Sequence, residues 1–217
     1  MSTTQVGAAS PLEQLDENAP LGMLLVVSGP SGVGKDTVWQ AAKNGLPSFT
    51  KAITCTTRPR REHEEEGVSY YFVDDKEFDR LIHDDEMLEW AHVHDHRYGV
   101  PVSSVLDRLV EGRDVICVID VQGAIRMRSL FPNSLLIFLK PPGNDHEQEL
   151  KKRLEQRGTT DEAEMERRLR TAVWELSQIP LYDNQIINDS VENAAQQLQE
   201  IVLAEKERRE NGGSEDE

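Results

Sequence analysis

The hydrophobic positions of the chain form short apolar runs separated by longer amphipathic segments. Three runs, at residues 23–27, 115–119 and 135–139, are apolar throughout, which is typical of strands buried on both faces of a sheet. Helical patterns at 102–111 and 122–130 precede and follow the second run. This alternation predicts a three-layer α/β fold with a parallel central sheet.

Further helices complete the predicted core. A helix over 38–44 follows the first strand and ends at Gly45 and Pro47, because glycine and proline commonly stop a helix. Two helices at 147–156 and 161–177 are joined by a turn at 158–160, with Thr160 or Asp161 as the N-cap of the second. A short strand at 186–188 and a helix at 191–208 close the fold.

Residues 54–99 interrupt this pattern. Strand patterns at 70–73 and 88–91 flank a helical pattern at 75–83, which predicts a small inserted subdomain. Such an insertion could close over a second ligand. The predicted boundaries are a core of 22–53, 100–140 and 180–208, an inserted subdomain of 54–99 and a helical region of about 141–179.

Composition limits the classes of function. The 217 residues fit one domain, and 40 acidic against 24 basic residues give a net charge of −16. That balance argues against a general nucleic-acid-binding surface, which needs a basic stripe. Two cysteines are too few for a disulfide framework, and we expect a cytoplasmic protein.

The two ends read as extensions. Residues 1–21 have neither a basic start nor an apolar run of secretory length, so we expect a flexible N-terminal extension. Residues 209–217 are polar and acidic, and we expect a disordered tail. No segment reaches the ~18 apolar residues of a membrane span, which predicts no membrane role.

The first strand leads into a phosphate-binding pattern. Gly29 to Lys35 reads GPSGVGK, which has the spacing of a P-loop between strand and helix. Gly32 and Gly34 let the backbone N–H groups curl around phosphate, and the Lys35 ammonium adds positive charge. The P-loop alone leaves kinases, GTPases and ATPase motors open.

The residue after the P-loop lysine departs from the pattern. Asp36 stands where a Ser or Thr that contacts magnesium is usual, and Thr37 follows it. A carboxylate is a hard oxygen ligand, so either Asp36 or Thr37 is a candidate Mg²⁺ ligand.

Three arginines, Arg58, Arg60 and Arg61, lie within four positions of this acidic chain. Arg58 and Arg61 could converge on one phosphate. Composition alone favours the alternative, a solvated charge run with salt bridges.

Several motifs together resemble guanylate kinases, in order and spacing, over roughly residues 22–205. They are SGPSGVGKDT at 28–37, TCTTRPRREHEEEGVSYYFV at 54–73, EWA at 89–91, YG at 98–99, IDVQG at 119–123, RGT at 157–159 and IND at 187–189. The resemblance implies a P-loop kinase fold and phosphoryl transfer from Mg-ATP to GMP, and to dGMP, giving ADP and GDP. It implies ATP and GMP as ligands of a monomer or homodimer.

The resemblance also implies roles for single residues. On the donor side, the backbone of Gly32, Val33, Gly34, Lys35, Asp36 and Thr37 would surround the ATP phosphates, and Asn188 and Asp189 would lie beside adenine. Lys35, Arg61, Arg157 and Arg168 would be catalytic, with Arg153, Arg157 and Arg168 on a closing lid.

On the acceptor side, Arg58, Arg61 and Tyr70 match residues on the GMP phosphate, and Tyr98 belongs to the same set. Glu89 matches the residue that reads guanine, because a carboxylate accepts from both the ring N–H and the exocyclic amine. Thr54 would lie near the other edge of the base. Asp120 would be a substrate-orienting or magnesium-linked carboxylate, for which a helix cap is the alternative.

Some positions depart from the family pattern. Val100 and Val118 stand where guanylate kinases usually have a hydroxyl residue and an acid, and both changes remove a polar group near the base. Two alternatives remain. A kinase for another phosphorylated acceptor, such as a ribose bisphosphate, is favoured by Asp36, whereas an inactive interaction module is disfavoured because the chain keeps Lys35, Arg157 and Arg168.

The alternating His92, His94 and His96 could suggest a metal site. An edge strand with polar outward residues explains them equally well.

Overall fold

The core of the molecule is a parallel sheet of five strands in the order β2-β7-β1-β8-β9. The computed structural model describes residues 21–93, 95–143, 146–156 and 162–212. The strands are β1 (Leu24–Ser28), β2 (Phe49–Lys51), β7 (Asp114–Val118), β8 (Leu135–Lys140) and β9 (Asn184–Ile187). The predicted three-layer fold with a parallel sheet is confirmed.

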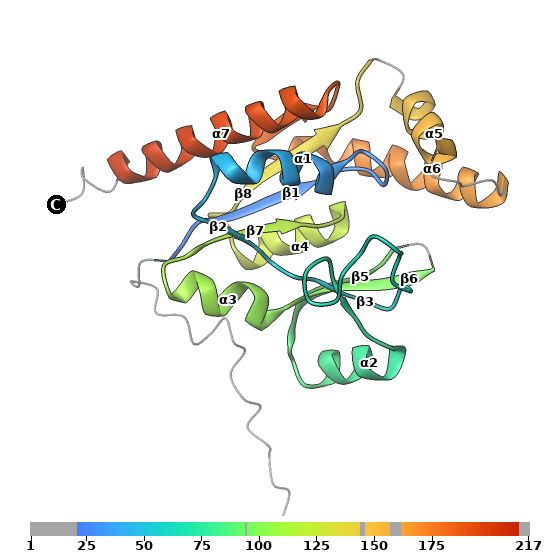
Figure 1. Ribbon diagram of the computed structural model, residues 1–217, viewed down its shortest axis with the longest axis horizontal. Coiled ribbons are helices and arrows are strands. Elements are labelled where there is room, and N and C mark those ends of the chain that lie inside the picture. Colours follow the sequence, from blue (N-terminus) through green and yellow to red (C-terminus); the bar gives the residue numbers. More distant parts are fainter. Residues whose placement is uncertain (1–20, 94, 144–145, 157–161, 213–217) are drawn as a thin grey trace, which may run out of the picture.

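Helices cover both faces of this sheet. Helices α1 (Lys35–Ala42) and α7 (Val191–Gly212) lie on one face, and α3 (Val102–Val110) and α4 (Val121–Leu130) on the other (Figure 1). Leu25 and Val27 of β1 pack with the first pair, whereas Leu24 and Val26 pack with the second. Because successive side chains of a strand point to opposite faces, two-sided burial explains why these strands are apolar throughout.

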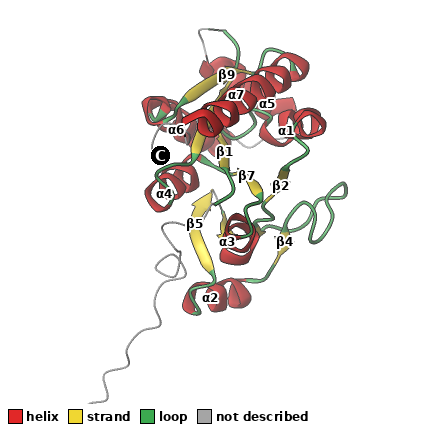
Figure 2. Ribbon diagram, turned by 90° about the vertical axis from the view of Figure 1, so that its left-hand side faces the viewer, coloured by secondary structure: helices red, strands yellow, loops and turns green. Residues whose placement is uncertain are grey.

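The insertion forms a second sheet beside the core. Its order is β4-β3-β6-β5, with β3 (Cys55–Thr56), β4 (Tyr71–Phe72), β5 (Met87–Val93) and β6 (His96–Pro101). Helix α2 (Asp75–His83) has the predicted bounds and packs Phe78 and Leu81 against Cys55. Figure 2 shows this subdomain at the end of the molecule away from α7.

Two helices, α5 (His146–Gln156) and α6 (Glu162–Ser177), lie side by side at the edge of the core (Figure 1). The predicted turn at 158–160 and the N-cap at Thr160 or Asp161 lie outside the described residues. Short 3₁₀ helices η1 (Lys43–Gly45) and η2 (Ile179–Leu181) follow α1 and α6.

The last helix is longer than the sequence predicts. Helix α7 continues past Arg208 to Gly212, so residues 209–212 are helical and do not belong to a tail. The Arg209 guanidinium donates to Glu205 Oε1 at 2.7 Å and to the Asn133 carbonyl oxygen at 2.6 Å. These contacts favour continued helix although the local sequence is polar.

The histidine segment is not a single strand. Val93 pairs with His96 and His92 with Arg97 in the β5–β6 hairpin, so the chain reverses direction between His92 and His96. Among the described residues, no three His, Cys, Asp or Glu side chains are arranged to hold a metal ion. No helix within the described ranges is long and apolar enough to cross a membrane.

Candidate active site

The P-loop lies at the carboxyl end of β1 and has a backbone that only glycine tolerates at two points. Gly29 has φ +145°, and a Cβ there would collide with the carbonyl oxygen of Leu139. Gly34 is the N-cap of α1 with φ +99°, and its Cβ would stand 2.7 Å from Asn188 Nδ2. Other residues are strained in this region of φ, so the loop's curvature depends on these glycines.

Polar contacts hold the loop in shape. The Lys35 ammonium donates to the carbonyl oxygens of Gly29 at 2.7 Å and Pro30 at 3.2 Å. The buried Asn188 amide donates to the Val33 carbonyl oxygen at 2.7 Å. The structure therefore brings Asn188 to the P-loop across more than 150 residues of sequence, while the neighbouring Asp189 is exposed.

Asp36 and Thr37 lie in the first turn of α1, and both are exposed. The Asp36 Oδ1 accepts a hydrogen bond from the Lys51 ammonium of β2 at 2.7 Å. Asp36 Oδ2 and the Thr37 hydroxyl are the other hard oxygen donors of this turn. Such oxygens suit Mg²⁺, so this donor set fits the metal.

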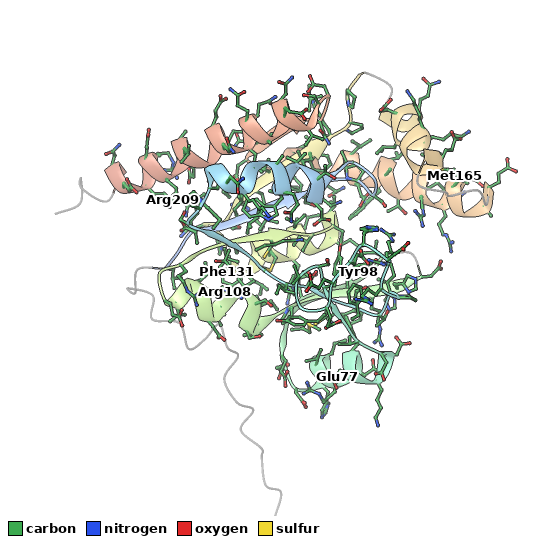
Figure 3. All side chains as sticks on the ribbon, viewed as in Figure 1. Glu77, Tyr98, Arg108, Phe131, Met165 and Arg209 are labelled. Carbon is green, nitrogen blue, oxygen red and sulfur yellow. The ribbon has the colours of Figure 1, made fainter. Side chains whose placement is uncertain are left out.

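Arg58 is the centre of a second cluster, in the small sheet. Its Nε donates to the Tyr98 hydroxyl at 3.2 Å, and its guanidinium lies 5.6 Å from the ring centre of Tyr70. Figure 3 labels Tyr98 in this subdomain and Met165 on α6. Burial, followed by the negative charge of Asp36, raises the pKa of the Tyr70 hydroxyl. The charge of Asp36, at the start of α1, therefore acts on Tyr70 of the small sheet.

Glu64 organises the arginine loop. Its Oε1 accepts from the Arg58 guanidinium at 2.7 Å, and its Oε2 from the Arg61 backbone N–H at 2.9 Å. Burial opposes ionisation of Glu64, but the hydrogen bonds from Arg58 and from the Arg61 backbone, together with the charges of both arginines, outweigh it and the net pKa is lowered. The Arg61 side chain itself is exposed. The structure thus pairs Arg58 with a carboxylate, and a shared phosphate contact of Arg58 and Arg61 stays a prediction.

Glu89 lies in a buried position between β5 and the start of α4. It is 6% exposed, and its carboxylate lies against Gly123 in the first turn of α4, where a Cβ would stand 2.9 Å from Oε1. Burial raises the pKa of Glu89 to about 8, and the negative charge of Asp120 adds to the rise, while Arg126 opposes it. A carboxyl group whose pKa is raised toward neutral pH in this way is typical of functional sites.

Asp120 caps α4. Its Oδ1 accepts from the backbone N–H groups of Gln122 at 2.8 Å and Gly123 at 3.2 Å. The cap that the sequence offered as an alternative is therefore present, and a contact with substrate stays a prediction. Thr54, which directly precedes β3, is also buried, with 8% of its surface exposed.

The two valines that depart from the family pattern have different surroundings. Val100 is fully buried and lies opposite Glu89 in the β5–β6 pairing. Val118 packs in the cluster beneath α1 and α7, on the face of the central sheet away from α4. Only Val100 therefore adjoins the predicted guanine-reading carboxylate.

Helix α6 carries two further candidate residues, Arg168 and Glu175. Arg168 is half-buried, whereas Glu175 is 5% exposed. A cavity of about 360 Å³ lies between α6 and the start of α4, lined by Gln122, Arg170, Thr171 and Trp174. Arg157 and the side chain of Arg153 lie outside the described residues.

Sequence patterns did not identify Lys51, Glu64 or Glu175. Glu64 lies in an acidic run that reads as solvated charge, and Lys51 meets Asp36 only through the fold. Glu175 had a usable signal, because it occupies a core-facing position between the buried Ala172 and the partly buried Leu176 of α6. An acid on the apolar side of an amphipathic helix is a candidate functional residue.

Comparisons with known proteins agree with this geometry. The chain matches the protein-family model described as "Guanylate kinase" over residues 22–205. A guanylate kinase of Caldanaerobacter subterraneus subsp. tengcongensis is 41% identical over 185 residues, covering 85% of this chain and 88% of that protein. One of Bacillus subtilis (strain 168) is 44% identical over 190 residues, covering 87% and 92%. The crystal structure of guanylate kinase from Anaplasma phagocytophilum is similar with a TM-score of 0.69 and 32% identity, covering 86% of this chain and 87% of that one.

Proposed function

The chain belongs to the guanylate kinase family, and from this premise we propose how its residues divide the work of the reaction. It is an enzyme that transfers a phosphoryl group from ATP to GMP, forming ADP and GDP. The roles are assigned from one feature of the structure. A P-loop in the core is accompanied by a buried carboxylate, Glu89, in the adjoining small sheet, and a carboxylate can accept both hydrogen-bond donors of guanine.

The P-loop is the donor half of the site. The N–H groups of residues 32–37 and the positive end of α1 surround the ATP phosphates. Lys35, which donates to Gly29 and Pro30 in this structure, turns to the β- and γ-phosphates. Asn188 supports the loop through Val33, and Asp189 lies beside adenine.

Guanylate kinases act on ATP together with Mg²⁺, and Asp36 and Thr37 are the residues of this chain that would hold the ion. When bound there, the ion would supply positive charge to neutralise the phosphates during transfer. The Lys51 ammonium pairs with Oδ1 of the Asp36 carboxylate at 2.7 Å.

The small sheet is the acceptor half. Arg58, Tyr70, Tyr98 and Arg61 bind the phosphate of GMP, so that two anions that repel each other are held at reacting distance. Ionised Glu89 accepts from the guanine ring N–H and amine, a donor pair that adenine lacks. Thr54 and Asp120 orient the base.

Helices α5 and α6 form the lid. Closing it brings Arg157 and Arg168 onto the transferring phosphoryl group, which stabilises the charge and excludes water that would hydrolyse ATP. Opening releases ADP and GDP.

An assay of ADP release tests the acceptor directly. GMP, dGMP, AMP and a ribose bisphosphate are each supplied with Mg-ATP. We expect turnover with GMP and dGMP, and a kcat/KM at least ~100-fold lower with AMP, because the buried carboxylate is left without its donor pair. Preference for the ribose bisphosphate would replace the nucleotide with another acceptor class, and no turnover with any acceptor would favour an interaction module.

A further inference from the structure

Glu175 is a buried acid to which neither the family motifs nor the roles above give a task. It lies on α6 with 5% of its surface exposed, and its Oε2 is buried without a hydrogen-bond partner among the described residues. A buried carboxylate oxygen without a partner costs free energy. Its presence on the apolar side of α6 therefore needs a reason other than stability.

Glu175 faces the P-loop. Burial raises its pKa to about 7, the charge of Lys35 lowers it, Asp120 raises it, and the Ser31 backbone N–H lowers it as a hydrogen-bond donor. The Tyr182 hydroxyl is also buried, and its pKa is raised by burial and by the charges of Asp120 and Glu175. The carboxylate thus connects α6 with the residue that precedes the phosphate-binding N–H groups.

The same face of α6 carries Arg168. Glu175 is seven positions after Arg168 on α6, which is about two turns at ~3.6 residues per turn, so their side chains project from one side of the helix. Between them Thr171 lines the cavity next to α4, and Ala172 is buried. An attachment at Glu175 therefore fixes the position of this face relative to the P-loop.

We propose that Glu175 is a positioning residue that ties α6 to the P-loop at Ser31 and so sets the place of Arg168 relative to Lys35, an inference that rests on the lid role proposed for Arg168. The carboxylate does not touch substrate. Its contribution is to keep the charge-stabilising guanidinium in register with the phosphates, where a displacement of about 1 Å can cost ~10²-fold in rate.

Glu175→Met is the informative variant, because methionine is unbranched and removes both the charge and the acceptor. We expect its melting temperature to equal or exceed that of the wild type, since an incompletely paired buried carboxylate is replaced by an apolar group. We expect kcat for GMP phosphorylation to fall about 10- to 100-fold with KM for GMP unchanged, because Glu175 is not part of the acceptor subdomain. Glu175→Gln keeps an oxygen that can accept from Ser31, and it should retain most of the activity.

The matched control is Glu166→Met on the same helix. Glu166 is exposed and, among the described residues, its ion pair is with Arg170 one turn away, so this variant should keep kcat within about twofold.

A double-mutant cycle with Arg168→Ala separates positioning from a general effect on the enzyme. If Glu175 acts through Arg168, adding Glu175→Met to Arg168→Ala costs little more, whereas independent effects multiply. Multiplying losses, a kcat of Glu175→Met within twofold of wild type, or a lowered melting temperature would each overturn the inference. An inactive wild-type protein would instead reject the phosphorylation of GMP itself, so the two failures are distinguishable.

Discussion

Glu64 binds Arg58 with a hydrogen bond of 2.7 Å, in an ion pair whose side chains are only 9% and 11% exposed. The same carboxylate accepts from the Arg61 backbone N–H at 2.9 Å. The arginine loop is therefore held in shape by a carboxylate of the same loop. In the proposed role of Arg58 as a ligand of the GMP phosphate, this contact positions its guanidinium before GMP binds. Preorganisation of this kind lowers the entropic cost of binding.

Replacing Arg58 should weaken the use of GMP specifically. We expect Arg58→Ala to raise KM for GMP about 10- to 100-fold, because it removes hydrogen bonds between charged groups. KM for ATP should stay near the wild-type value. Steady-state kinetics with each substrate varied in turn measure both.

Arg60 supplies a matched control in the same run. Its side chain is exposed, and its guanidinium donates a long hydrogen bond of 3.4 Å to the Glu64 carbonyl oxygen. Arg60→Ala should change KM for GMP less than twofold. Equal effects of the two substitutions would mean that the run acts as diffuse positive charge and not through Arg58.

Asp36 tests the magnesium assignment. If its carboxylate acts on the ion or on water bound to it, Asp36→Ala should raise the half-saturating Mg²⁺ concentration about tenfold, as loss of a metal-supporting group does. Asp36→Ser restores the usual hydroxyl of the motif and should recover most of the affinity. Activity is measured over a magnesium titration at fixed ATP.

Lys51→Ala is the control for Asp36, because it breaks the 2.7 Å ion pair but keeps the carboxylate. It should not weaken magnesium activation. Unchanged magnesium dependence in Asp36→Ala would show that the carboxylate serves only its pair with Lys51.

The sequence predicted the core well because local pattern and tertiary setting agree there. Residues 115–119 and 135–139 became β7 and β8 with ends shifted by at most one residue, since only a strand buried on both faces is apolar at every position. Strands β2 and β3 span three and two residues, too short for a periodic signal, and their place is set by their partners.

The site was predictable where a motif lies in one segment and was missed where the fold supplies the partner. Gly34 follows from the P-loop spacing, but its contact with Asn188 joins residues 154 positions apart. Lys51, Glu64 and Glu175 gain their meaning only from such contacts. The resemblance of several motifs therefore predicts residues that would contact the substrates, whereas the residues that position them emerge only from the fold.

The use of GMP should depend on the ionisation of Glu89. Ionised Glu89 accepts both guanine donors and protonated Glu89 does not, and its pKa is raised to about 8 by burial first and by Asp120 second. We expect kcat/KM for GMP to rise with pH up to about 8 and then level. Glu89→Gln should lower kcat/KM about 10- to 100-fold and remove this rise, while ATP binding is retained.

The titration of the GMP phosphate affects the wild type and Glu89→Gln alike, so a comparison of their two pH profiles removes its contribution. A rise of the same size and midpoint in Glu89→Gln would assign the pH dependence to another group.

Glu89 should also make stability depend on pH. The folded protein binds the proton more tightly than the unfolded chain, whose glutamate pKa is 4.5. The stabilising contribution is therefore complete below about 4.5 and is lost as pH rises through about 8. Melting curves from pH 5 to 9 should show the melting temperature of Glu89→Gln rising relative to that of the wild type as pH increases. A constant difference between the two melting temperatures would contradict the raised pKa.

Val100 should control where Glu89 titrates. The two residues are opposite each other on β6 and β5, so their side chains share a face of the small sheet, and Val100 is fully buried. Val100→Thr places a hydroxyl where it can donate to the ionised carboxylate, which favours the charged form. We expect the midpoint of the kcat/KM profile for GMP to fall by about one pH unit, the size of one hydrogen bond to a charged group.

Val118→Thr is the matched change on the other face of the central sheet. Val118 packs under α1 and α7, so the new hydroxyl is buried away from Glu89 and should cost about 1–3 kcal/mol of stability without moving the pH midpoint. If both variants leave the midpoint unchanged, the valine opposite Glu89 does not set its pKa. If both shift it, the effect comes from altered packing of the core and not from a hydroxyl beside the carboxylate.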